Sequence, residues 1–174
     1  MKKEYPRNYF CNLVRRRIYF LYNCISVNII KYILLVILLL LVSITDIKEF
    51  RIPNTILGSF MLIRSGILVY EISQKTVYIN NVISTLLLVI SIFIVGVLMK
   101  IVIGNGIGFG DIKLLMVVTF YMGSAKSLDI IYSSILVMGV IDLIALVLRC
   151  KTRKDAMPFA PAVLLGTIFA SVLW

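Results

Sequence analysis

Histidine is missing from the 174-residue sequence, and acidic residues are few, with 8 aspartates and glutamates against 18 lysines and arginines. Without histidine, Ser-His and Cys-His catalysis are excluded, and so is the commonest metal ligand. The three cysteines, Cys11, Cys24 and Cys150, show no C-x-x-C spacing, so neither a zinc knuckle nor a disulfide framework is supported. Chemistry must therefore come from Asp, Glu, Lys, Ser or Tyr, and we expect neither a cofactor nor a bound metal.

Charged residues make up only 15% of the chain and hydrophobic residues 61%, which is too apolar for a soluble domain of this length. A helix needs roughly 20 mostly apolar residues to cross a bilayer core. The connections at 71–76 and 123–127 are short, so neighbouring helices should be antiparallel. We predict an all-α polytopic membrane protein, with about six transmembrane helices in one bundle. The predicted segments are residues 29–45, 53–70, 77–103, 111–122 (the short one), 128–148 and 158–174.

Residues 1–28 form a separate basic segment ahead of the membrane domain predicted for residues 29–174. A basic start followed by an apolar run resembles a signal peptide, but the run ends without a small-x-small cleavage site, so we expect it to be retained. Arg15, Arg16 and Arg17 stand beside several aromatic residues, a mixture that fits a helix in the membrane interface or an extra crossing. The sequence leaves both alternatives open.

Basic residues are distributed unevenly between the two sides of the predicted bundle. The connections after the first, third and fifth segments contain both motif aspartates and six basic residues: Lys48, Arg51, Arg149, Lys151, Arg153 and Lys154. The opposite connections contain only two, Lys75 and Lys126. By the positive-inside rule, the first set faces the cytoplasm. The net charge of +10 is thus attributed to cytoplasmic loops and anionic lipid headgroups, and we expect no nucleic-acid partner. The basic residues at 2–31 oppose this orientation, because six helices would place them outside.

Two aspartates stand at the ends of apolar segments. Asp46 follows the first segment, and Asp111 follows Gly108, Phe109 and Gly110 just before the fourth. Acids at such depths are costly, so they suggest function. Asp111 should lie at a helix N-terminus, which stabilises its charge, while Asp46 lies at a helix C-terminus, which favours the protonated form. One ionised and one neutral acid can activate water and protonate an amide, as in aspartic proteases. Taken singly, either acid is more often a helix cap or a solvated loop residue.

Three motifs in order resemble the type IV prepilin leader peptidase family, polytopic GxGD aspartic proteases related to archaeal preflagellin peptidases. The resemblance covers about residues 29–174. The motifs are Asp46 with Arg51-Ile52-Pro53-Asn54, then GFGDIKLL at 108–115, then Met157-Pro158-Phe159-Ala160-Pro161 at the start of the last helix.

The resemblance implies that Asp46 and Asp111 are the catalytic pair. Motif support is implied for Gly108, Gly110, Lys113, Arg51, Pro53, Asn54, Pro158, Phe159 and Pro161. Lys113 could hold the ionised aspartate or a substrate carboxylate, or be an ordinary interfacial lysine. The proline motif is also similar to that of presenilin-like proteases, whose first aspartate lies in a different context. Long members of the family carry a cysteine-bearing methylation domain, and we expect this chain to be the short, cleavage-only form found with Tad-type systems.

We therefore expect a cell-membrane enzyme that cleaves the short basic leader of pilin-like precursors at the cytoplasmic face, in possible association with pilus or secretion machinery. Two rivals stay open: a transporter or proton relay that uses intramembrane acids, and a catalytically silent assembly factor. Two further charges lie within predicted helices. Asp142 is interpreted as a structural acid, and Arg64 as a residue that snorkels or pairs, with Asp142 as the suggested partner.

Overall fold

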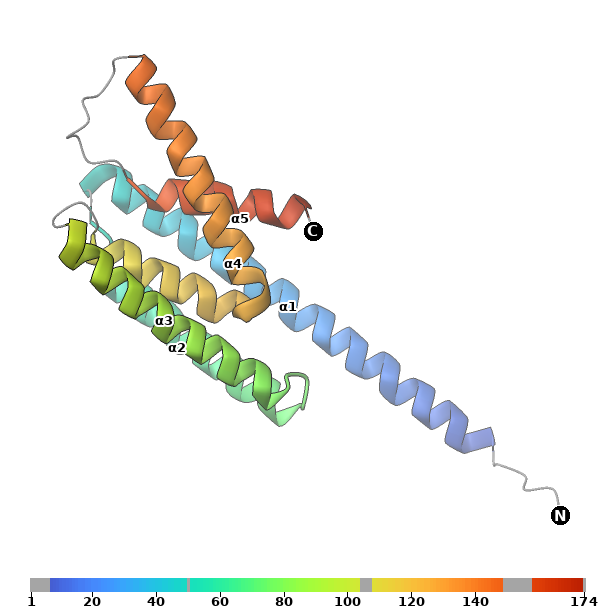
Figure 1. Cartoon of the computed structure of the whole chain (residues 1–174). Coiled ribbons are helices and arrows are strands. Elements are labelled where there is room, and N and C mark those ends of the chain that lie inside the picture. The colour runs from blue at the N-terminus through green and yellow to red at the C-terminus, as the bar shows by residue number, and fades with distance from the viewer. Residues whose placement is uncertain (1–6, 50, 104–107, 149–157, 174) are drawn as a thin grey trace.

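A computed structural model describes residues 7–49, 51–103, 108–148 and 158–173. All regular structure in these ranges is helical, which confirms the predicted all-α class (Figure 1). The helices are α1 (Arg7–Glu49), α2 (Asn54–Ser73), α3 (Ile79–Ile103), α4 (Phe109–Val147) and α5 (Ala160–Leu173). By length and composition, four of these described helices could cross a membrane: α1 from Ile25 onward, α2, α3 and α4.

Helix α4 contains both the fourth and the fifth segments predicted from the sequence. Gly123 within it has φ 80° and ψ 171°, which is not helical, and it separates a first arm, residues 109–122, from a second arm, residues 124–147. Figure 1 shows the sharp bend between the two arms. Among the described residues, a helix covers most of each predicted segment, but the length criterion identifies four candidate crossings there, so the count of six is not confirmed.

Helix α1 begins well before the apolar segment. It runs without interruption from Arg7 to Glu49 and so passes through the predicted boundary between residues 28 and 29. Figure 1 shows its N-terminal half projecting away from the other helices. The basic segment upstream of the membrane domain is therefore continuous in backbone with the first apolar helix.

The core lies where α1, the first arm of α4 and α5 meet. Large apolar side chains such as Leu87, Ile90 and Phe169 are exposed on the outer surface, as expected for helices surrounded by lipid. The buried cluster draws on four helices: Leu35, Leu38, Leu39 and Val42 of α1, Leu57 of α2, Leu114, Val117, Val118, Tyr121 and Ile130 of α4, and Ala160 and Val163 of α5.

Candidate active site

Asp46 lies in the last turn of α1, and its side chain is buried, with the residue only 5% exposed. The backbone N–H of Ala160 donates a hydrogen bond of 3.0 Å to its Oδ2. Ala160 is the first residue of α5, where backbone N–H groups have no partner within their own helix. The N-terminus of α5 therefore supplies a donor and a positive partial charge to this acid.

Asp111 lies in the first turn of α4, as the sequence predicts. Gly108 occupies the N-cap position with extended φ of −74° and ψ of 139°, and its carbonyl accepts a hydrogen bond of 3.2 Å from the Asp111 backbone N–H. A Cβ atom at Gly108 would lie 3.1 Å from Oδ2 of Asp111. The absence of a side chain at Gly108 thus leaves the carboxylate the space that it occupies.

The fold brings the two aspartates together. The negative charge of Asp46 is close enough to act on the carboxyl group of Asp111, although the two residues belong to different helices. Nearby carboxyl groups resist being ionised together, so such a pair can share one proton. The prediction that Asp46 is the neutral member rested on its position at the end of α1 and stays a prediction. The structure adds a hydrogen bond from the Ala160 N–H, a contact that the sequence did not indicate.

The residues around Gly110 connect the start of α2 to the start of α4. A Cβ atom at Gly110 would lie 3.1 Å from Cβ of Ile52, so the glycine permits close packing of these two segments. Pro53 takes the N-cap position of α2 with φ −70° and ψ 120°. Nζ of Lys113 donates to Oδ1 of Asn54, the first residue of α2, across 2.9 Å. Lys113 is exposed and bonded to Asn54, and this contact links α2 to α4.

The remaining motif residues surround the same region. Arg51 is exposed in the connection between α1 and α2. Pro158 and Phe159 directly precede α5, Phe159 packs against the core cluster, and Pro161 is the second residue of α5. Proline is favourable in the first turn of a helix, where its missing N–H costs no intrahelical bond. Met157 and the basic residues at 149–154 lie outside the described residues.

The suggested pairing of Arg64 with Asp142 is wrong. Nη1 of Arg64 lies 2.8 Å from Oε2 of Glu71, and its Nε donates to the carbonyl of Phe120 across 3.0 Å. Asp142 is exposed on the second arm of α4. Arg64 and Glu71 are seven residues apart, which is two helical turns, so the sequence already placed them on one face of α2. Glu71 also pairs with Lys31 of α1, whose Nζ lies 2.7 Å from Oε1 of Glu71. No local pattern in the sequence indicated this second pair.

The family model described as the type IV leader peptidase family matches residues 33–144, a range that contains Asp46, Asp111 and the residues between them. The chain belongs to this family. It is 26% identical over 146 residues to the prepilin leader peptidase/N-methyltransferase of Bacillus subtilis (strain 168), an alignment that covers 84% of this chain. The chain spans 56% of the length of that relative. No solved structure matches the chain.

Proposed function

We propose that this protein is an aspartic endopeptidase that removes the short basic leader from type IV pilin-like precursors at the cytoplasmic face of the cell membrane. The observation that carries the proposal is the proximity of Asp46 and Asp111, two family-motif acids from different helices. Membership of the leader peptidase family and the similarity to a prepilin leader peptidase support the substrate class.

The mechanism uses a water molecule held between the two carboxyl groups. The ionised carboxyl removes a proton from this water, which attacks the scissile carbonyl, while the protonated carboxyl donates its proton toward the peptide. The carboxyl that took the proton from water then donates it to the departing amine as the C–N bond breaks, and the other carboxyl recovers its proton from a hydroxyl of the tetrahedral intermediate. No covalent enzyme intermediate forms. The Ala160 N–H stabilises the negative charge that the pair retains throughout.

The cytoplasmic orientation rests on the basic residues around the site. Lys48, in the last turn of α1, and Arg51, in the connection from α1 to α2, are both exposed and follow Asp46 closely in the sequence. Lysine and arginine near membrane helix ends favour the cytoplasmic side. In this orientation the pair meets the precursor before its leader is exported. A proton relay, the rival function, would require acids spaced through the membrane depth, whereas these two acids lie together.

The direct test is co-expression of the full chain with a pilin-like precursor that has a short basic leader and a glycine before its apolar helix. Mass spectrometry of the precursor should show a new N-terminus directly after the leader. A matched reaction with the Asp111→Asn variant should leave the precursor intact. Failure of the unaltered chain to cleave, under conditions in which the Bacillus subtilis relative cleaves the same precursor, would contradict the proposal and favour a silent assembly role.

A further inference from the structure

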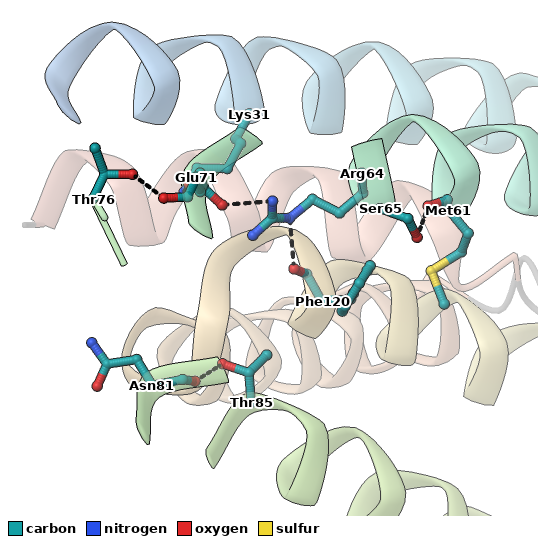
Figure 2. A network of polar contacts seen from close by, with 9 residues as sticks. All are labelled: Lys31, Met61, Arg64, Ser65, Glu71, Thr76, Asn81, Thr85 and Phe120. Atoms are coloured by element: carbon teal, nitrogen blue, oxygen red, sulfur yellow. Dashed lines mark hydrogen bonds and ion pairs between the residues drawn. The ribbon is translucent and has the colours of Figure 1, made fainter. Parts of the chain in front are cut away.

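A buried polar network lies away from the two aspartates and connects the helices that carry them. Figure 2 shows Lys31 of α1 reaching Glu71 of α2, and Arg64 of α2 reaching both Glu71 and Phe120 of α4. All three charged side chains are largely buried, at 13% exposure for Lys31, 6% for Arg64 and 3% for Glu71. Buried charges are costly unless paired, and here each of the three side chains has a partner of opposite charge.

The network ends at the break in α4. In an uninterrupted helix the carbonyl of Phe120 would accept the N–H of Ser124, four residues on. Here Gly123 lies between them in a conformation available essentially to glycine alone, and each group meets a different helix instead. The Phe120 carbonyl accepts from Nε of Arg64 in α2, and the Ser124 N–H donates to Oγ1 of Thr85 in α3 across 3.2 Å. Two neighbouring helices thus satisfy the two backbone groups that the break releases.

Further contacts hold the first arm of α4 along α2. The hydroxyl of Tyr121 donates to the carbonyl of Phe60 across 2.8 Å, and the Arg64 guanidinium lies 5.5 Å from the centre of the Phe120 ring. At the other end of the arm, Lys113 bonds Asn54. The arm that carries Asp111 is therefore attached to α2 at both ends, with the residue numbers increasing in the same direction along both helices.

The same network attaches α2 to the helix that carries Asp46. Lys31 lies 15 residues before Asp46 in α1, or about 22 Å along the helix axis. Phe120 lies nine residues after Asp111, or about 13 Å along the first arm. The chain of contacts from Lys31 through Glu71 and Arg64 to the Phe120 carbonyl thus joins the two acid-bearing helices at points remote from the acids themselves.

We propose that Lys31, Glu71 and Arg64, together with Thr85 at the break, are positioning residues that set the placement of Asp111 relative to Asp46. They act on the reaction through the helices and do not touch the reacting atoms. The expected effect on kcat rests on the proposed function. The expected effect on the break at Gly123 does not depend on that function. Because misplacement of reacting groups by about 1 Å can lower the rate about 100-fold, loosening the network should lower kcat more than it raises KM.

The test separates positioning from simple stabilisation. The triple variant Lys31→Met, Arg64→Met, Glu71→Met removes every charge of the network together, and apolar replacement of a complete buried ion set is often neutral for folding. The full chain in lipid nanodiscs is examined by hydrogen–deuterium exchange in peptides that contain Gly123 and by cleavage of a pilin-like precursor. We expect normal accumulation, faster exchange at the break, and a kcat lowered about tenfold or more with little change in KM.

Two further variants and two controls complete the experiment. Thr85→Val keeps the side-chain shape and removes the acceptor of the Ser124 N–H, together with the bond that the hydroxyl donates to the Asn81 carbonyl within α3. It should also speed exchange at the break and lower kcat. It decides the question if the triple variant fails to accumulate. Gly123→Ala places a side chain on a residue with φ of +80°, which is strained, so it should also speed exchange at the break and lower kcat. Two controls should change neither the exchange rate nor kcat. Gly139→Ala adds a Cβ in open space. Ser65→Ala removes a hydroxyl that bonds the Met61 carbonyl of its own helix, as Figure 2 shows.

Each outcome has a definite consequence. Faster exchange together with a lower kcat supports the inference. Wild-type kcat in a triple variant that accumulates overturns it, and so does a lower kcat with unchanged exchange. Hydrogen exchange is measured without substrate, so unchanged exchange in the variants overturns the inference even if the unaltered chain cleaves nothing. Absence of cleavage by the unaltered chain would count against the proposed function instead.

Discussion

The backbone N–H of Ala160 and the carboxylate of Asp46 are hydrogen-bonded at 3.0 Å, although 114 residues separate them in the sequence. This contact joins the end of α1 to the beginning of α5. It gives the buried acid a donor from a helix N-terminus, where backbone N–H groups favour a negatively charged partner. The proline motif therefore has a direct structural relation to Asp46, because it sets where α5 begins.

Replacement of either aspartate by asparagine should abolish cleavage and leave the protein in the membrane. At position 46 the asparagine carbonyl can still accept from Ala160, so the architecture persists while the acid chemistry is lost. The double variant should be no less active than either single variant, since the residues act as a unit. Precursor cleavage and membrane accumulation are the measurements, with Asp129→Asn, an exposed acid at the start of the second arm, as the control.

Asp46→Ala should differ from Asp46→Asn in stability as well as in activity. It leaves the Ala160 N–H buried without its acceptor, a loss that costs about 1–3 kcal/mol. The alanine variant should therefore unfold at a lower temperature than the asparagine variant when both are purified in the same detergent. Equal melting temperatures for the two variants would show that the hydrogen bond to Ala160 contributes nothing to stability.

Gly110→Ala should lower cleavage, whereas Gly58→Ala should not. The Cβ added at Gly110 would press on Cβ of Ile52 at 3.1 Å, which is a backbone-proximal atom that cannot swing away. A Cβ at Gly58 has open space, so this substitution is the matched control. The strain should displace the start of α4, and with it Asp111. Adding Ile52→Ala leaves that Cβ in place and should give little recovery, whereas Ile52→Gly should restore activity in part.

A cysteine at Lys48 should be shielded from an impermeant thiol reagent in intact cells, and one at Lys75 should be labelled. Both lysines are exposed, and they lie at opposite ends of the span formed by α2. The experiment requires a background in which Cys11, Cys24 and Cys150 are serines. The reverse labelling pattern would place the aspartate pair outside the cell and rule out leader removal before export. It would also agree better with a cytoplasmic basic segment at residues 2–31.

Cleavage should resist chelators and should follow a bell-shaped pH profile. The sequence offers no histidine and no C-x-x-C pair, so the usual zinc ligands are lacking, and a paired-carboxyl mechanism requires none. The rate should fall at low pH as the ionised carboxyl gains a proton and at high pH as its partner loses one, and both limbs belong to the pair. Loss of activity on chelation, with recovery on added zinc, would show instead that the carboxylates bind metal.

The sequence by itself determined the all-helical membrane class and the local placement of the motif residues. Apolar runs of sufficient length must form helices in lipid, where each backbone group needs a partner in its own segment. The first turn of α4 at Asp111 and the start of α2 at Asn54 were also predictable, because glycine and proline mark helix boundaries locally.

Only the tertiary structure decided how the charges are partnered. The sequence suggested Asp142 for Arg64, whereas the folded chain gives it Glu71 and the Phe120 carbonyl, and it gives Asp46 a backbone donor from Ala160. Local patterns carry no information about which distant group fills a buried hydrogen bond. The break at Gly123 shows the same limit, since its released backbone groups are satisfied by Arg64 and Thr85 from two other helices. These partners follow from how the helices pack, and packing is a property of the whole chain.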